Sequence, residues 1–313
     1  RLGRELKPFD LWYDGFKSRS SINEDLLSAK TRALYPTTMA FEKGMPDILV
    51  KLGFSAKDAA SISSLVTVDN SRGSGHAWGA QMKGDKAHLR TRLQPGGMDY
   101  KGYNIALHEF GHNVEQVISL HEVDHYILNG IPSTAFTEAL AFVFQKRDLQ
   151  VLGMGIKDAA KQDVAALSAD DLQTLDIFWG CYEIMGVSLV DMKVWQWLYE
   201  NPDATAEDLK ATVIRIATEL WNAYYEPFLG EKDSPLLAIY SHMIEIPLYL
   251  SNYPYGHIVE FQLEKLFGNT LPGKEIQRIY PTGRVTPDFW MKAAVGAPVS
   301  VDPLLEATAN AVK

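Results

Sequence analysis

The sequence predicts a mainly α fold with a small antiparallel β-sheet. Apolar residues recur at the spacing of an amphipathic helix through most of the 313 residues, and this period is the main sequence signal for helices. One stretch punctuated by glycine, residues 65–93, carries short β-type runs instead. No Gly/Ser linker, low-complexity tract or repeat divides the chain. We therefore expect one domain over residues 1–313, with enough apolar residues for a sizeable core.

The first elements are helices. Helical periodicity runs from Asn23 to Leu52, with breaks expected near Tyr35-Pro36 and from Gly44 to Pro46, since proline interrupts helical hydrogen bonding. A second helix is expected from Ser55 to Ser63, because Ser55 with Asp58 three residues on is a variant of the capping box.

The β region follows, with strands expected over Leu65–Val68, Gly75–Met82 and Ala87–Leu93. The turn signal Gly84-Asp85 predicts that the last two form a hairpin. The strand that begins at Gly75, His76 and Ala77 carries the small residues Gly75, Ala77, Gly79 and Ala80. Such a strand at a sheet edge can dock an extended peptide through main-chain hydrogen bonds, so Gly75, His76 and Ala77 are predicted to contact substrate. A covered hairpin without a ligand explains the same pattern.

The remaining elements are predicted as helices by the same period. They cover Tyr100–Leu120, Thr134–Asp148, Lys157–Leu167, Asp170–Glu200, Thr205–Tyr225, Leu236–Glu245, Pro254–Phe267 and Pro287–Ala294. In the longest of them, Gly180 and Gly186 are the places where a bend would occur.

The helix expected from Tyr100 contains the pentapeptide His108-Glu109-Phe110-Gly111-His112. Residues four apart lie on one helical face, so His108 and His112 can bind one metal ion while Glu109 reaches the adjacent face. This is the HExxH pattern that binds Zn²⁺ and holds a general base. A chance match on a solvated helix is the alternative, and the uncharged flanks argue against it.

A second match, from His121 to His125, carries Asp124 inside the motif and lies among loop-forming residues. We predict a surface segment there, because an extra charge beside the base would be costly to desolvate.

A tetrahedral catalytic zinc needs a third protein ligand. Glu138 is the only carboxylate in the uncharged stretch from Ile131 to Gln145. A lone buried glutamate is costly unless it is paired or binds a metal. Glu138 is therefore the predicted third ligand of one Zn²⁺ per chain, and an exposed glutamate on an amphipathic helix is the alternative.

The order of HExxH, a connection of about twenty-five residues and a glutamate on a second helix resembles the gluzincin metallopeptidases. Within them, the chain resembles thimet oligopeptidase and oligoendopeptidase F and, more distantly, angiotensin-converting enzyme. Three further segments are loosely similar to parts of these enzymes. Leu6–Trp12 resembles the entry to their catalytic part, Ser74–Gly79 a Gly/Ala-rich strand beside the cleft, and Tyr249–His257 a tyrosine-rich loop that leads into a helix. The resemblance implies a zincin-like helical catalytic domain that hydrolyses short peptides, and a protein with a further N-terminal region.

The resemblance also implies an oxyanion donor from the late tyrosine-rich segment. Two alignments are open, because one places Tyr253 at the donor position and the other places His257 there. Tyr255 and His242 are expected to contribute to substrate binding, together with the strand from Gly75. Glu109 is expected to be the general base.

Charge and composition limit the kinds of molecule that this protein is expected to bind. The formal net charge is −9 without a Lys/Arg cluster, which argues against nucleic acid or an anionic membrane as a main partner. No apolar run is long enough to span a bilayer and no signal peptide is visible. Cys181 is the only cysteine, so no internal disulfide can form. The cytoplasm is the favoured compartment, although the sequence does not determine it.

Two other functions remain open at this level. One is a non-catalytic zinc-binding scaffold, against which the retained Glu109 argues because a structural site has no need of the base. The other is a zinc hydrolase of a non-peptide amide, which nothing in the sequence excludes.

Overall fold

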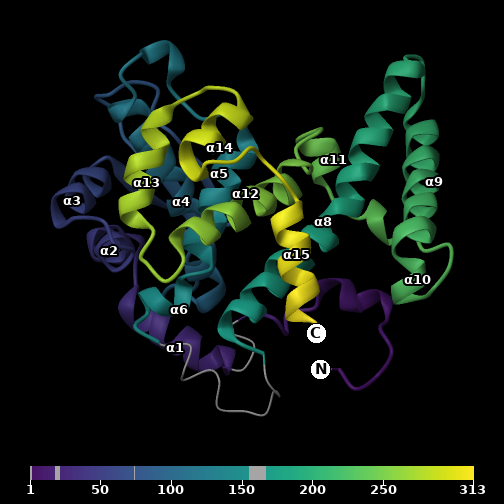
Figure 1. Ribbon diagram of the computed structural model, residues 1–313, viewed down its shortest axis with the longest axis horizontal. Coiled ribbons are helices and arrows are strands. Elements are labelled where there is room, and N and C mark those ends of the chain that lie inside the picture. Colours follow the sequence, from purple (N-terminus) through teal and green to yellow (C-terminus); the bar gives the residue numbers. More distant parts are fainter. Residues whose placement is uncertain (1, 18–21, 74, 155–166) are drawn as a thin grey trace. The chain divides into compact units, whose positions relative to one another are not determined.

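The computed structural model describes residues 2–17, 22–73, 75–154 and 167–313. Within these ranges helices dominate, and the only sheet has three strands (Figure 1). The chain divides into two compact units, which are described separately. Unit 1 comprises Arg1–Lys17, Val164–His257 and Leu304–Lys313, and unit 2 comprises Ser18–Asp163 and Ile258–Pro303. The mainly α fold class is confirmed, whereas the single domain stays a prediction.

Unit 2 is built around the long helix α4, Tyr100–Glu122, which begins at an N-cap where Asp99 accepts a hydrogen bond from the Gly102 N–H. Its other helices are α1 Glu24–Leu34, α2 Thr38–Lys51, α3 Ala56–Ser64, α5 Thr134–Gln145, α6 Asp148–Val151, α13 Gly273–Ile279 and α14 Pro287–Val295. The 3-10 turns Tyr126–Leu128 and Tyr280–Thr282 complete it. Helix α12, Asn252–Phe267, begins in unit 1 and ends in unit 2.

Helix α4 is buried on most of its faces, and α5 packs against it at very short range. A Cβ on Gly111 would lie 2.7 Å from the Ala141 Cα and 3.0 Å from the Leu140 carbonyl oxygen. Only glycine therefore permits this crossing. The aromatic ring of Phe110 meets that of Phe144 edge to face, with centroids 5.9 Å apart.

The sheet lies beside α4 and has the strand order β1-β3-β2, from β1 Val66–Ser71, β2 His76–Trp78 and β3 Ala87–Arg92. The predicted hairpin is confirmed as the antiparallel pair of β2 and β3. The expectation of an all-antiparallel sheet is wrong, because β1 pairs with β3 in parallel. Every second residue of β3 is buried, which suits the centre of the sheet, whereas β2 buries little and forms an edge.

Hydrogen bonds fix the sheet to α4. The Thr91 hydroxyl donates to the Gly102 carbonyl over 3.0 Å, and the Asn113 amide donates to the His88 carbonyl over 3.3 Å. These contacts hold β3 against the helix that carries the histidine motif, and β2 is joined to β3 by strand pairing.

Unit 1 is a helical assembly in which α8, Ala169–Glu200, and α9, Ala206–Tyr224, run side by side (Figure 1). Its shorter elements are the 3-10 turns Pro8–Trp12 and Leu236–Ala238, the helices α10 Glu226–Leu229 and α11 His242–Glu245, and most of α15 Asp302–Ala311. Helix α8 is continuous. The Gly186 N–H donates to the Tyr225 hydroxyl over 2.8 Å, so this glycine serves close packing.

Some helix predictions were wrong. No break occurs at Gly44–Pro46, because α2 runs through Pro46 with Phe41, Met45 and Ile48 fully buried around it, and this packing offsets the proline cost of about 3 kcal/mol. The helix expected over Leu236–Glu245 is two short pieces. Only Leu237 and Met243 are buried there, a spacing that gives no apolar stripe.

Other helices differ from the prediction in where they end or were not predicted at all. Helix α5 stops at Gln145 rather than Asp148, while α13 and α15 were not predicted. The helix predicted from Lys157 to Leu167 lies almost entirely outside the described residues.

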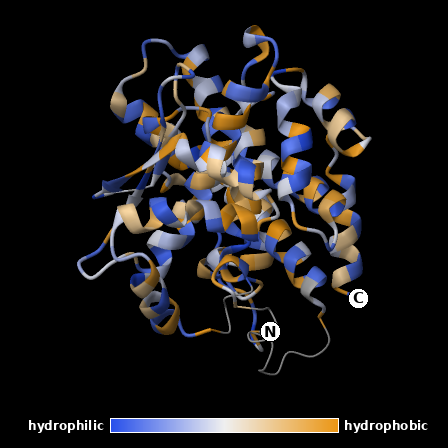
Figure 2. Cartoon of the chain, turned by 90° about the vertical axis from the view of Figure 1, so that its left-hand side faces the viewer, coloured by the Kyte–Doolittle hydropathy of each residue, from blue (hydrophilic) through white to orange (hydrophobic). Residues whose placement is uncertain are grey.

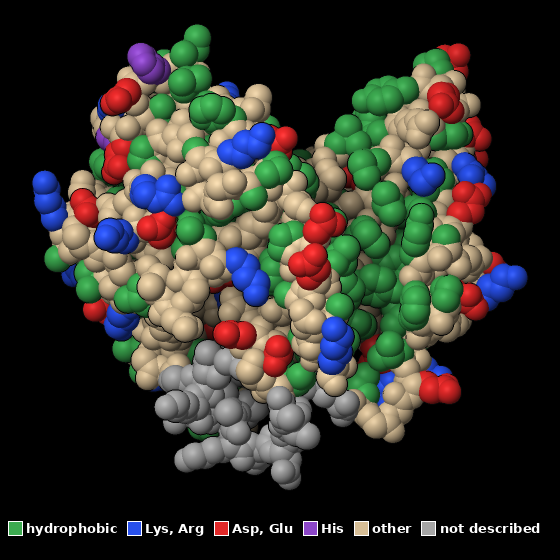
Figure 3. Space-filling view, in the orientation of Figure 1, with side chains coloured by type: hydrophobic (Ala, Val, Ile, Leu, Met, Phe, Trp, Pro, Cys, Tyr) green, Lys and Arg blue, Asp and Glu red, His purple; other side chains and the backbone are tan. Residues whose placement is uncertain are grey.

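The helices carry alternating apolar and polar bands, as amphipathic helices do (Figure 2). Hydrophobic side chains also gather on the surface in the region of α8 and α9 (Figure 3). Met192 and Tyr199 of α8 and Ile214 of α9 are exposed. Among the described helices, none has the length and apolar character needed to cross a membrane.

Candidate metal centre

Helix α4 brings His108 and His112 together in unit 2. Their side chains are 16% and 11% exposed, and their Nε2 atoms are 3.2 Å apart. The i, i+4 spacing therefore places both imidazoles on one face, as the sequence predicts.

Glu138 reaches the same point from α5. Its Oε2 lies 3.4 Å from the His108 Nε2 and 3.8 Å from the His112 Nε2, and the carboxylate is buried. Ligands of a tetrahedral zinc at 2.0–2.2 Å would stand about 3.3–3.6 Å apart. Among the described residues, these three form the one His/Cys/Asp/Glu group able to hold a metal ion, and the donor set fits one.

The Nδ1 atom of each histidine, which points away from the other two ligands, has a hydrogen-bond partner on α5. The Nδ1 of His112 lies 2.8 Å from the Thr137 hydroxyl, and the Nδ1 of His108 lies 3.1 Å from the Gln145 Oε1. Such partners orient the rings of metal-binding histidines and turn the other nitrogen towards the ion. Sequence reasoning missed both. Gln145 is seven residues after Glu138, on the same face of α5, and that spacing was the available signal.

The charges of the centre are set by burial. Burial lowers the pKa of His112 to about 4, which keeps a neutral imidazole for a metal at neutral pH. Burial also lowers the pKa of His108, but the hydrogen bond and negative charge of Glu138 outweigh it and the net shift is upward.

Glu109 lies beside the three ligands with only 8% of its surface exposed. Burial raises the pKa of Glu109 to about 7, with His108 opposing and Glu138 adding to the shift. A carboxyl group with this pKa can both take and return a proton near neutral pH.

The strand-edge residue Gly75 lies against Glu109. A Cβ at this position would be 2.4 Å from the Ile105 Cγ2 and 3.1 Å from the Glu109 Oε1. His76 is exposed and Ala77 partly buried on the β2 edge that follows. Of the predicted docking residues, Gly75 is thus adjacent to Glu109, and the contact of all three with a peptide stays a prediction.

A hollow of about 500 Å³ continues from this region. It is lined by Gly79 beyond β2, by Gln116 of α4 and by Thr137, the partner of His112. The hollow is large enough for a substrate side chain.

Comparison with solved structures identifies the fold. BsuCP is 16% identical, with a TM-score of 0.53 over 94% of this chain and 62% of its own. A protein provisionally named oligoendopeptidase F is 15% identical, with a TM-score of 0.58 over 95% of this chain and 56% of its own. The chain shares the fold of these proteins.

A provisionally assigned peptidase from Chlamydophila abortus is 12% identical, with a TM-score of 0.50 over 88% of this chain and 46% of its own. This chain therefore spans about half to three fifths of these neighbours. At such identities the likeness shows the fold alone. No protein-family model and no curated protein matches the sequence.

The second HExxH match does not form a site. Helix α4 ends at Glu122, so His121 lies on the last turn and His125 lies beyond the helix. This agrees with the predicted surface segment.

The remaining predicted residues belong to unit 1. The ring of Tyr253 meets that of His242 edge to face at 6.0 Å, and Tyr249 packs on Tyr253 at 5.5 Å. The imidazole of His257 lies against Gly180, where a Cβ would be 3.0 Å from its Nε2. Tyr255 is in the first turns of α12. The roles of Tyr253, Tyr255, His257 and His242 stay predictions.

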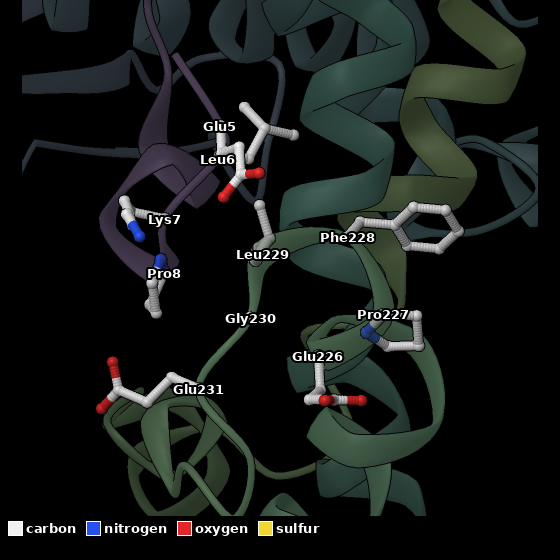
Figure 4. A pocket seen from close by; sticks show the side chains of 10 residues that line it. All are labelled: Glu5, Leu6, Lys7, Pro8, Glu226, Pro227, Phe228, Leu229, Gly230 and Glu231. Carbon is white, nitrogen blue, oxygen red and sulfur yellow. The ribbon is translucent and has the colours of Figure 1, made fainter.

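Unit 1 has a hollow of its own, of about 460 Å³, between the N-terminal segment and the end of α10 (Figure 4). Glu5, Glu226 and Glu231 line it, with Lys7 as its cation. It contains none of the predicted site residues.

Proposed function

We propose that this chain is the catalytic part of a zinc-dependent metallopeptidase that hydrolyses short peptides. One observation carries the proposal, the convergence of His108, His112 and Glu138 with the buried Glu109 beside them. Two imidazoles and one carboxylate are a donor set of catalytic zinc sites. The names of two solved neighbours with this fold, an oligoendopeptidase F and a peptidase, support the same function.

When bound, the ion supplies Lewis acidity and lowers the pKa of a water molecule. His108 and His112 would hold the ion through Nε2, and the Nδ1 partners Gln145 and Thr137 keep both rings in orientation. Glu109 takes the proton of the attacking water and transfers it to the leaving amine nitrogen. Burial favours the protonated form of Glu109 that can return the proton, whereas a bound cation would favour the charged form that accepts it.

The β2 edge is the proposed binding site for the peptide backbone. It lies at the edge of the sheet, and Gly75 brings it next to Glu109. An extended substrate that pairs with this edge would pass the metal centre. We also propose that Tyr253 or His257 donates to the oxyanion of the tetrahedral intermediate.

The deciding experiment combines elemental analysis with cleavage of a mixed peptide library. The expected result is one zinc per chain and peptide cleavage that Glu109→Gln abolishes. Bound zinc without cleavage of any peptide would favour a scaffold, and turnover of non-peptide amides alone would change the substrate class. Zinc at His121 and His125, or binding that does not need Glu138, would overturn the site.

A further inference from the structure

A chain of hydrogen bonds runs from His108 to a buried carboxylate. The Gln145 side chain meets the His108 Nδ1 through Oε1, over 3.1 Å. Its Nε2 donates to the Asn104 Oδ1 over 2.8 Å. The Asn104 Nδ2 donates in turn to the Asp148 Oδ2 over 2.7 Å. All four residues belong to unit 2, and Asp148 and Asn104 are buried.

Asp148 determines which group donates and which accepts in each of these hydrogen bonds. Its carboxylate accepts from the Leu149 N–H over 2.6 Å and from the Tyr100 hydroxyl, and hydrogen bonds of this kind favour the charged form. A charged carboxylate only accepts, so Asn104 must turn its NH₂ towards Asp148. The amide oxygen of Asn104 then faces Gln145.

The orientation of Asn104 in turn determines the orientation of Gln145 and the tautomer of His108. Gln145 must turn its NH₂ towards the Asn104 oxygen, and its own oxygen then faces the ring of His108. An amide oxygen only accepts. His108 therefore donates from Nδ1 and, in its neutral form, keeps the Nε2 lone pair for a metal.

We propose that Asp148 is a positioning residue of the metal centre, which sets the tautomer of His108 through Asn104 and Gln145. Its effect on zinc affinity rests on the function proposed above. Its effect on the tautomer does not, because the hydrogen bonds lie outside the space between the ligands.

The first test is Asp148→Asn, which replaces an acceptor by a group that also donates. The side-chain amides of Asn104 and Gln145 can then both rotate by half a turn, so that Gln145 presents its NH₂ to His108. Zinc affinity, measured by competition with a chelator, should fall about 10- to 100-fold, as for other partners of metal-binding histidines. Unchanged affinity would overturn the proposal.

The second test moves the carboxylate instead of removing it. In the double variant Asp148→Asn with Gln145→Glu, the new carboxylate faces His108 directly and must accept from Nδ1. Asn104 can reverse and donate to position 145, and it can accept from the amide at position 148. Zinc affinity should recover to within a few-fold of the wild-type value. A loss equal to or deeper than that of Asp148→Asn would contradict the proposal.

Tyr100→Phe is the matched control, because it also deletes a hydrogen bond to the Asp148 Oδ2 but leaves the direction of the chain unchanged. Its thermal stability should fall while zinc affinity stays near wild type. An affinity loss like that of Asp148→Asn would mean that packing around Asp148, not polarity, matters.

A readout without metal separates this proposal from the proposed function. In the metal-free protein the Glu138 carboxylate faces the His108 Nε2 and can accept its proton, so the measurement uses the metal-free Glu138→Ala variant. Nitrogen-15 NMR of this variant at alkaline pH should show His108 protonated at Nδ1, and adding Asp148→Asn should shift the proton towards Nε2. If the wild type binds no zinc but Glu138→Ala shows the Nδ1 tautomer, the proposed function fails and the positioning role stands. A proton on Nε2 in Glu138→Ala would overturn the role itself.

Discussion

Glu109 is a buried carboxyl group, and the amide of glutamine has nearly the same shape. Glu109→Gln should therefore keep the fold and the bound zinc. Turnover of a fluorogenic peptide should fall about 10²- to 10⁴-fold, because an amide cannot accept the proton. Circular dichroism and elemental analysis are the controls. A variant that binds zinc and retains the wild-type rate would exclude Glu109 as the base.

Tyr253 is the preferred oxyanion donor, since a neutral phenol donates a hydrogen bond over a wide pH range. Tyr253→Phe removes one hydroxyl and should lower kcat about 10²- to 10³-fold, with little change in KM because the bond forms mainly in the transition state.

His257→Ala is the companion measurement, with a similar but less clean loss expected because it also opens space beside Gly180. If Tyr253→Phe is fully active and His257→Ala is inactive, the other alignment is correct.

The sequence predicted the residues that would bind a metal, but it did not predict the residues whose hydrogen bonds orient these ligands. Glu138 stood out because no other charge surrounds it in the sequence. Gln145 and Asn104 did not, because polar residues near helix ends are common and belong to no motif. Their helical spacing, seven after Glu138 and four before His108, was informative only once α4 and α5 were known to face each other.

At the scale of elements, the crossing of α4 and α5 decides whether the three ligands meet. Gly111→Ala would place a Cβ 2.7 Å from the Ala141 backbone, and overpacking of this kind typically costs about 1–3 kcal/mol. The midpoint of thermal unfolding should fall and zinc affinity should weaken as Glu138 moves away.

Gly84→Ala is the matched control for this prediction, since nothing lies within 4 Å of a Cβ there and its stability should hold. Equal stability of the two variants would show that α5 can move without cost.

Element types were more predictable than pairing. The residues of each strand predicted that strand. The parallel pairing of β1 with β3 depends instead on which strand takes the central position in the sheet, and no local sequence pattern encodes that. Similarly, Pro46 is a helix breaker by its own chemistry, and the buried residues around it reverse the outcome through tertiary packing.

At the scale of the molecule, zinc should act as a stabilising ligand. Binding to the native state alone adds about 2.7 kcal/mol to the free energy of unfolding at a free zinc concentration 100 times the Kd. A chelator should therefore lower the unfolding temperature of the wild type and leave His112→Ala unchanged. Equal effects on both proteins would place the stabilising metal elsewhere.

Substrate size is the other property of the whole molecule. We expect cleavage of oligopeptides and not of native globular proteins, because a strand-edge binding mode needs an extended backbone. Mass spectrometry of digests of a peptide mixture and of a folded protein would measure the difference. Digestion of the folded protein with the peptides intact would contradict it.

Gly75 has a consequence for how this protein can change over generations. It has no functional group, so chemical labelling or a pH titration would never detect it. Yet every replacement adds a carbon atom where Ile105 and Glu109 already are. In a saturation mutagenesis screen scored by activity, position 75 should tolerate substitution as poorly as the histidines do, and selection should keep it fixed for the sake of its neighbour's shape.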